Sequence, residues 1–241
     1  MNRIVYPFWL VPALQWAVDV RDPCSSSHGY TSLIMHWSPF PGEKSLPWDI
    51  IKSVGRRIYG TEKAVDPESD YESKELPAIW HSHRSVMKDS VAVDDVLFPM
   101  ILSLNSPDGL ARAGNMLGPD FEYHLFASAT GMHATRDEFE LACERVLNLE
   151  RAIQVRNYHR QRSDDETAIP YFEHVEWWQN PFIGEKKRLE RQKLLPLLEN
   201  YYRLRGWDLT RGRPTWSKLR QLGLADVAME LTQAGLIATA T

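Results

Sequence analysis

The stretch from Thr135 to Val155 constrains the fold more than any other part of the sequence. Apolar residues recur in it at helical spacing, at Phe139, Ala142, Val146, Leu149 and Ile153. This spacing predicts one apolar stripe of an amphipathic helix. Thr135, followed three residues later by Glu138, is the pattern of a capping box, in which each residue satisfies a backbone N–H of the first turn. The other face of the helix carries charged residues, namely Glu144, Arg145, Glu150, Arg151 and Arg156.

Most of the remaining chain shows the same helical pattern, and no segment shows the run of alternating strands that a sheet protein has. We therefore expect a mainly α fold. Further helices are predicted at Leu10–Ala17, Trp48–Tyr59, Ala78–Met87, Phe121–Gly131, Leu189–Arg205 and Pro214–Leu222. Polar, Gly- and Pro-rich segments are predicted to be turns, loops or breaks, at Arg21–Tyr30, Gly60–Pro77, Asn105–Pro119 and Ser163–Pro170.

The composition excludes several classes of protein. Of 241 residues, 43% are hydrophobic and 25% are charged, as in ordinary soluble globular proteins. A net charge of −4 provides no basic footprint for nucleic acid, and no apolar run is long enough to cross a bilayer. With only two cysteines, a disulfide framework is excluded and a cytoplasmic location is expected. Two cysteines also cannot ligate a four-iron cluster by themselves.

Three features that could suggest a site are better explained by packing. His81 and His83 form an HxH pair like that of some zinc hydrolases, but residues two apart on a helix do not face one another. The aromatic residues Trp177, Trp178, Phe182, Tyr201, Tyr202 and Trp207 are expected to pack between helices. Cys143 is expected to be an inert buried thiol, and Cys24 lies in a turn where we assign it no role.

The long helix and the segments after it resemble the carboxyl-terminal signature of the aldehyde:ferredoxin oxidoreductase family. The run Glu144–Arg156 (ERVLNLERAIQVR) is similar to the family pattern ERxxNLER…NxR, with Gln154 in place of its second Asn. The matching blocks that follow, in family order, are DDET at 164–167, YYRLRGW at 201–207, Lys218-Leu219 and LGL at 222–224. One such block could belong to any charged helix, whereas the ordered set is specific. The resemblance begins around residue 13 and its blocks fill roughly the last half of the chain.

The resemblance implies both a fold and a chemistry. Family members are tungsten or molybdenum enzymes with a bis-pterin cofactor and a [4Fe–4S] cluster. They oxidise aldehydes to acids, or reduce related acyl substrates, and electrons leave through the cluster to a ferredoxin-type carrier. The implied fold is an irregular helical bundle like the family's carboxyl-terminal domains, with 1–241 expected to form one such domain. The protein part of such an enzyme orients substrate and transfers protons, while the metal performs the redox step.

The segment Asp89–Asp94 (DSVAVD) resembles the family element DSxGLC. By this resemblance Asp89 hydrogen-bonds the pterin, and the backbone at Ala92 and Val93 lies against it. Ala92 stands where the family has Gly, and Asp94 stands where the family has a cluster-ligating Cys. Because carboxylate is a harder and weaker ligand than thiolate for an iron–sulfur cluster, we expect this ligand to be lost or altered. The structural alternative is a helix cap with a solvated face.

The segment Arg21–Tyr30 resembles the family's NRGGCH segment, in which a histidine near the metal donates a proton. His28 takes that place and Tyr30 matches the family's nearby Lys, after an insertion of about three residues. Imidazole suits this role because its pKa lies near neutral pH. The alternative is a surface histidine in a serine-rich turn.

Two parts of the family enzymes have no counterpart in this sequence: the amino-terminal β-rich pterin-binding domain and the CxxCxxxC cluster motif. The isolated chain is therefore expected to be inactive. The interpretation that follows is the carboxyl-terminal part of a split enzyme, whose partner chain carries the missing domains. The alternatives are a truncated remnant and a non-catalytic helical interaction module.

Overall fold

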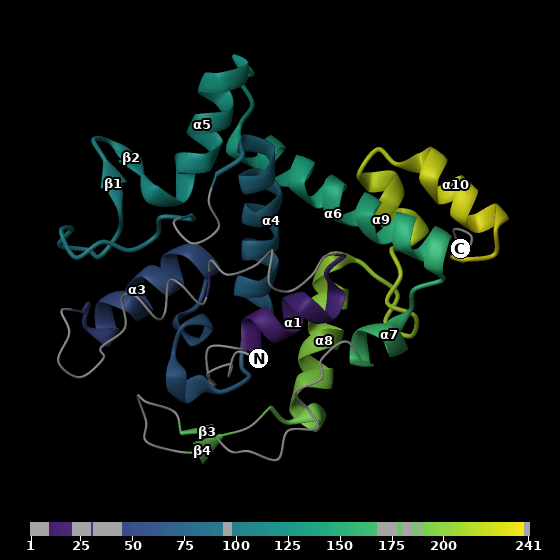
Figure 1. Ribbon diagram of the computed structural model, residues 1–241, viewed down its shortest axis with the longest axis horizontal. Coiled ribbons are helices and arrows are strands. Elements are labelled where there is room, and N and C mark those ends of the chain that lie inside the picture. Colours follow the sequence, from purple (N-terminus) through teal and green to yellow (C-terminus); the bar gives the residue numbers. More distant parts are fainter. Residues whose placement is uncertain are drawn as a thin grey trace.

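The computed structural model describes residues 10–20, 30, 45–93, 98–167, 178–179, 186–187 and 189–238. Over these residues the fold is mainly α, as predicted (Figure 1). The helices are α1 (Leu10–Val18), α3 (Trp48–Tyr59), α4 (Glu75–Val91), α5 (Phe121–Thr130), α6 (Arg136–Tyr158), α7 (Arg162–Thr167), α8 (Arg191–Arg205), α9 (Trp216–Gln221) and α10 (Ala225–Gln233), with short 3₁₀ turns at Glu62–Ala64, Pro67–Ser69 and Gly118–Asp120. Two antiparallel pairs of two-residue strands complete it: β1 (Arg112–Ala113) with β2 (Met116–Leu117), and β3 (Trp178–Gln179) with β4 (Lys186–Lys187).

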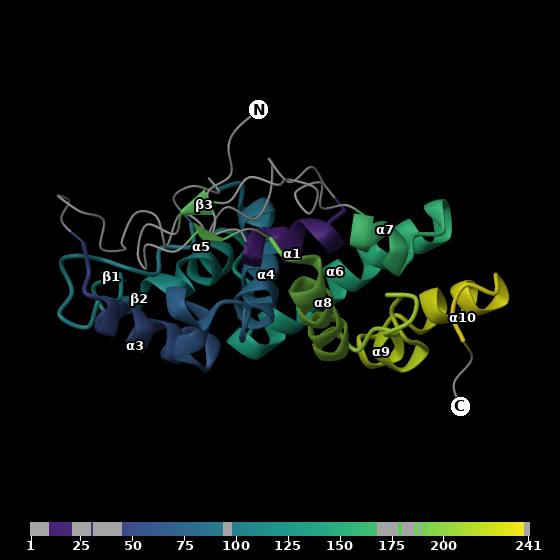
Figure 2. The ribbon, with the colours of Figure 1, turned by 90° about the horizontal axis from the view of Figure 1, so that it is seen from below.

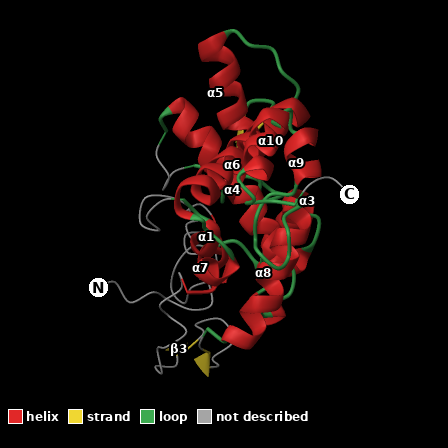
Figure 3. Cartoon of the chain, turned by 90° about the vertical axis from the view of Figure 1, so that its right-hand side faces the viewer, coloured by secondary structure: helices red, strands yellow, loops and turns green. Residues whose placement is uncertain are grey.

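Helix α4 stands at the centre and contacts α1, α3, α5, α6 and α8 (Figure 1). Helix α6 runs away from α4 toward α9 and α10, and α10 packs against α6 and α9. Figure 2 shows α3 and α10 at the two ends of the long axis, and Figure 3 shows α5 and α8 at opposite edges of the helical stack.

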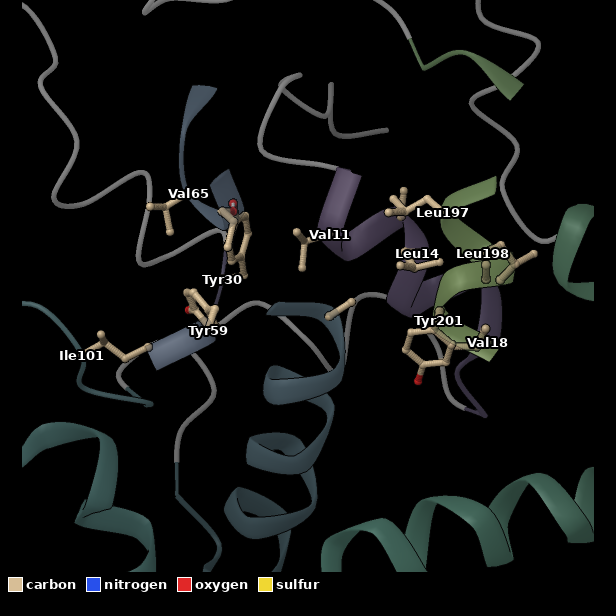
Figure 4. Close-up of a cluster of buried hydrophobic side chains, with 14 of the residues drawn as sticks. Val11, Leu14, Val18, Tyr30, Tyr59, Val65, Ile101, Leu197, Leu198 and Tyr201 are labelled. Atoms are coloured by element: carbon tan, nitrogen blue, oxygen red, sulfur yellow. Dashed lines mark hydrogen bonds between the residues drawn. The ribbon is translucent and has the colours of Figure 1, made fainter. Parts of the chain in front are cut away.

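The main hydrophobic core lies where α1 meets α4 and α8. In Figure 4, Leu14 and Val18 of α1 lie beside Leu198 and Tyr201 of α8. Two smaller cores exist among the described residues. One joins the carboxyl end of α6 to α9 and α10, through residues that include Val155, Leu219 and Leu231, and the other joins Met87 of α4 to Phe139 and Cys143 of α6.

The predicted helix ends are confirmed where their capping chemistry is local. The Thr135 hydroxyl accepts a hydrogen bond from the Glu138 N–H (3.2 Å), and the Glu138 carboxylate accepts one from the Thr135 N–H (2.7 Å), which completes the capping box. Gly131 and Gly206 end α5 and α8 in the left-handed conformation that glycine adopts at little cost.

Two connections differ from expectation. The segment Ser163–Pro170 was expected to be a polar break, yet α7 occupies its first half because the Asp164 carboxylate caps the Gln161 N–H (2.8 Å) and Arg162 pairs with Glu166 one turn later (2.7 Å). The segment Asn105–Pro119 contains the β1–β2 hairpin, whose turn includes Gly114 at a φ of 60°. Helix α10 extends the helical part beyond the last predicted helix.

Helix α6 departs from the usual amphipathic arrangement. Of the predicted stripe only Phe139 is buried, while Val146, Leu149 and Ile153 are 36–41% exposed and Ala142 is also exposed. The buried side contains polar and charged residues, with Asn148 and Arg151 at 0% and 1% exposure. An amphipathic helix ordinarily buries its apolar side, whereas α6 buries Glu144, Asn148 and Arg151 on the same side as the apolar Cys143, Ala152 and Val155.

Within the described ranges, every helix is too short or too polar to span a membrane.

Candidate functional site

The predicted cofactor-contacting residues lie at the carboxyl end of α4. Asp89 is exposed on the last turn of the helix. Ala92 ends the helix in the left-handed conformation, with φ 54° and ψ 45°, and the N–H groups of Ala92 and Val93 both donate to the Lys88 carbonyl. The left-handed region is the one that glycine adopts most readily, and the family element has Gly at this position. Asp94 and His28 lie outside the described residues.

Buried polar groups fix the position of this helix end. The Lys88 side chain is 3% exposed, and its ammonium donates to the Phe98 carbonyl (3.3 Å). One turn earlier, the buried Arg84 guanidinium forms an ion pair with Glu140 of α6 and stacks on Trp80, 4.6 Å from the ring centre. These contacts hold the α4 backbone, so that Asp89 and the turn at Ala92 are presented on a fixed element.

Glu144 of α6 is the centre of a buried polar cluster. Its carboxylate pairs with Arg205 of α8 and with Lys218 of α9 (3.0 Å), and it lies 2.9 Å from Nε2 of His83 in α4. Burial alone would raise the pKa of Glu144, but Arg205, His83 and Lys218 together hold it well below its usual range. Four helices therefore meet at one ionised carboxylate.

His83 lies between two carboxylates, with Nδ1 2.6 Å from Glu140 and Nε2 2.9 Å from Glu144. The Arg205 guanidinium is 3.0 Å from the same Nε2. Burial lowers the pKa of His83 to about 4, and the nearby Arg205 opposes the raising effect of Glu144. The imidazole is therefore neutral near pH 7, and in this form only one of its two nitrogens carries a hydrogen to donate to a carboxylate.

A second buried cluster is centred on Arg151. Its guanidinium makes two bonds to Asp165 of α7 (2.9 and 2.5 Å) and donates to the Gly212 carbonyl (2.7 Å). Asp165 is fully buried and also receives bonds from Tyr202 and from Arg160 (2.9 Å). A bidentate pair with further donors satisfies both ions, which is the condition under which such a pair tolerates burial.

These two clusters bring the separate sequence blocks of the family signature together. Asn148, between them on α6, accepts a bond from the Trp207 indole (2.9 Å) and donates to the Glu144 carbonyl (2.8 Å). The run ERVLNLER thus contacts DDET through Arg151, YYRLRGW through Asn148, and Lys218 through Glu144. Glu144 and Arg151 were expected on the charged face opposite the apolar stripe, because no local signal identifies partners that lie up to 74 residues away, as Lys218 does from Glu144.

The histidine pair, the aromatic residues and Cys143, which were attributed to packing, can now be placed where the structure describes them. His81 bonds to the Tyr59 hydroxyl (2.8 Å), whereas His83 contacts α6, so the two histidines do not converge. Tyr201, Tyr202 and Trp207 are buried core residues, as predicted. Cys143 is 3% exposed, and burial raises the pKa of its thiol to about 11, in agreement with an inert thiol. Trp177, Phe182 and Cys24 lie outside the described residues.

The described residues fit the two implied cofactors differently. No group of three or more His, Cys, Asp or Glu side chains among them is placed to hold a metal ion. Of the two cysteines in the sequence, Cys143 is a buried thiol, so the donor set of this chain does not fit a four-iron cluster. At the end of α4, Asp89 is exposed and the left-handed turn at Ala92 follows it.

A cleft of about 30 Å³ lies where α1, α4, α6 and α8 meet, lined in part by Gln15, Ser82, Ser85 and Tyr201. Gln15 is 1% exposed, and both atoms of its amide are without a partner among the described residues. This volume suits about two water molecules and is too small for an organic cofactor. A pterin therefore does not fit inside this cleft.

Comparison with known proteins gives one family model and one solved structure of interest. One solved structure, described as the active site complex BamBC of benzoyl coenzyme A reductase in complex with 1,5-dienoyl-CoA, has a TM-score of 0.43 and 20% identity to this chain. The match covers 100% of this chain and 29% of that one, so this chain spans less than a third of its length. The family model described as aldehyde ferredoxin oxidoreductase, domains 2 and 3, matches residues 13–224. The chain belongs to the aldehyde ferredoxin oxidoreductase family, of which it carries the region of domains 2 and 3.

Proposed function

We propose that this chain is the carboxyl-terminal part of an aldehyde:ferredoxin oxidoreductase-like enzyme and forms one wall of a metallopterin cavity. The observation that carries the proposal is the end of α4: an exposed Asp89 next to a left-handed turn at Ala92, on a helix fixed by buried polar clusters. A rigid element that presents a polar group outward is a suitable support for a cofactor. The single helical domain over 1–241 is part of the same proposal.

Each residue has a distinct role in this proposal. The Asp89 carboxylate accepts hydrogen bonds from the pterin, and the backbone of Ala92 and Val93 lies against its ring. A tungsten or molybdenum centre on that cofactor would supply the two-electron redox chemistry of an aldehyde or a related acyl substrate. His28 would donate or accept the proton, since imidazole titrates near neutral pH.

The remaining parts of the enzyme are assigned to a partner chain. It would carry the pterin-binding domain and the CxxCxxxC motif, so the [4Fe–4S] cluster would be ligated mainly by its thiolates, with Asp94 as the one position this chain could contribute. Electrons would leave from there to a ferredoxin-type carrier. The alternative is a non-catalytic helical interaction module, and the cofactor content of the complex distinguishes it from this proposal.

The test is co-expression with the partner, identified as a neighbouring gene that encodes the pterin domain and CxxCxxxC. Tungsten or molybdenum, iron and pterin are then measured in the purified chain and in the purified complex. We expect all three in the complex and none in the chain alone. A complex that forms but contains no metal or pterin would favour the interaction module.

The matched variants are Asp89→Ala and Asp226→Ala, which both remove an exposed aspartate, the second from α10. We expect Asp89→Ala to lower the pterin content of the complex by more than about tenfold, the loss of roughly one charge-assisted hydrogen bond. Asp226→Ala should retain pterin fully. Equal pterin content in the two variants would contradict the role of Asp89.

A further inference from the structure

A second candidate site lies at the other end of α6 from α5, in the loop that joins α8 to α9 (Figure 1). A cleft of about 950 Å³ opens between this loop and the segment after α10. It is lined by Asp208, Thr210, Arg211, Arg213, Pro214, Thr215, Trp216, Ser217, Arg220 and Gly235–Ala238. Cavities of this size accommodate ligands as large as a nucleotide.

The lining is strongly basic in a chain with a net charge of −4. Three arginines, Arg211, Arg213 and Arg220, face a single carboxylate, Asp208. Arg213 is 8% exposed and donates to the carbonyls of Leu236 (2.7 Å) and His159 (3.2 Å), so it forms part of the floor.

The other two guanidiniums are exposed and stay available to a ligand. Arg220 lies over the Trp216 ring at 5.3 Å, and neither Arg211 nor Arg220 makes a side-chain hydrogen bond or ion pair with any residue that the structure describes. Burial lowers the pKa of Arg213, and the positive charges of Arg211 and Arg151 lower it further, against the opposing effect of Asp164 and Asp208. An anion in the cleft would relieve this repulsion.

The uncharged lining separates into a polar and an apolar side. Thr210 and Ser217 supply exposed hydroxyls, which donate to phosphate oxygens as readily as they do to water. Pro214, Leu236 and Ile237 supply apolar surface, and Trp216 supplies an aromatic ring that is only partly buried. Planar groups pack well on such a ring.

We infer that this cleft binds a nucleotide-sized organic phosphate, with Arg211 and Arg220 on the phosphates and the Trp216 side of the cleft against a planar ring. Guanidinium groups bind phosphate through parallel hydrogen bonds, so Arg211 and Arg220 suit this role. The inference goes beyond the proposed function, because it uses no residue of the α4 end.

The test uses the full chain with ADP, inorganic pyrophosphate and adenosine as probes, titrated by calorimetry at low ionic strength. We expect ADP and pyrophosphate to bind and adenosine to bind much more weakly, since phosphate supplies most of the attraction. Arg211→Ala/Arg220→Ala should weaken ADP binding at least about tenfold. The matched control is Arg203→Ala, which removes an exposed arginine of α8 and should leave ADP binding unchanged.

Trp216→Leu tests the contact with the planar ring separately from the contact with the phosphates. It should weaken the binding of ADP and leave the binding of pyrophosphate unchanged. The absence of ADP binding at about millimolar concentration, the weak end of specific affinities, would overturn the site. So would ADP binding that is equal in wild type and in the double arginine variant. Both arginines are exposed and lie outside the α4 end. The absence of ADP binding would therefore not contradict the proposed role of the α4 end in holding a pterin.

Discussion

Ala92 is the residue whose backbone conformation most directly connects the sequence to the proposed site. It adopts a φ of 54° at the end of α4, where a side chain meets the following carbonyl oxygen. The family's glycine at this position would avoid that contact. The turn is retained here with alanine, which indicates that the contacts of Lys88 and Arg84 fix the helix end strongly enough to offset the strain.

Replacing Ala92 with glycine should therefore stabilise the chain. We expect Ala92→Gly to raise the free energy of unfolding by about 1 kcal/mol, which is the usual cost of the left-handed region for a residue with a Cβ. The measurement is urea denaturation followed by circular dichroism. Ala142→Gly, on the exposed side of α6, is the matched control and should lower the same free energy by about 1 kcal/mol. Loss of stability in both variants would show that the turn at Ala92 is not strained.

His83 makes the stability of the chain dependent on pH. Its pKa is about 4 in the folded chain and about 6.5 when unfolded, so the unfolded chain takes up a proton first as the pH falls. The contribution of His83 to the free energy of unfolding is therefore complete above pH 6.5 and is lost as the pH falls toward 4. The loss is about 2 kcal/mol at pH 5. His83→Gln should remove this part of the loss in denaturation curves at pH 7 and pH 5, and the remainder would come from His81, whose pKa burial also lowers.

The control for this prediction is His133→Gln, at an exposed position between α5 and α6. It should retain the wild-type difference between the two pH values. If His83→Gln also retains it, the imidazole is protonated in the fold and forms ion pairs with Glu140 and Glu144.

At the scale of elements, α6 separates what a sequence pattern determines from what it does not. The spacing of Phe139, Val146 and Leu149 predicts a helix, and the capping box at Thr135 predicts where the helix begins; both are confirmed. Neither signal determines the buried side. That choice follows from long-range partners: Arg205 neutralises Glu144, and Asp165 neutralises Arg151. These pairings are absent from any local window of the sequence.

The candidate sites also contain some residues that a sequence pattern identified and others that it did not. Asp89 and Ala92 were named from a short motif and lie at the end of α4, where their contact with a pterin stays a prediction. His28 and Asp94, which were also named from short motifs, lie outside the described residues and stay predictions. No sequence motif predicted the arginine cleft, because Arg211, Arg213 and Arg220 come together only when the α8–α9 loop folds.

Substitutions on the two sides of α6 should differ sharply in how much they lower the free energy of unfolding. Val146→Gln and Leu149→Gln should each lower the free energy of unfolding by less than about 1 kcal/mol, because these side chains already contact water. Arg151→Met should lower it by about 3 kcal/mol or more, because Asp165 keeps a buried charge with fewer donors. Chemical denaturation of the three variants measures this. Equal losses would mean that the apolar stripe, and not the polar side, carries the packing of α6.

At the scale of the whole molecule, polar bonds couple hydrophobic cores that are otherwise separate. The core of α9 and α10 is joined to the rest by Lys218 on Glu144, by Arg145 on the Leu222 carbonyl (2.7 Å), and by Arg213 on the carbonyls of His159 and Leu236. Arg156 also pairs with Glu230 of α10 (3.1 Å), and Val155 of α6 packs in the same core. The polar bonds therefore add to an apolar contact in keeping α9 and α10 folded with the rest.

Arg213→Met should therefore divide a single unfolding transition into two. In scanning calorimetry we expect the wild-type chain to show one transition, with equal calorimetric and van't Hoff enthalpies. The variant should show an earlier transition for α9 and α10, since loss of the buried guanidinium leaves carbonyl groups without donors at a cost of about 1–3 kcal/mol. Arg220→Ala, exposed in the same cleft, should preserve the single transition. One transition that moves as a whole in Arg213→Met would instead show that apolar packing around Val155 and Leu231, and not the polar bonds, joins the two parts.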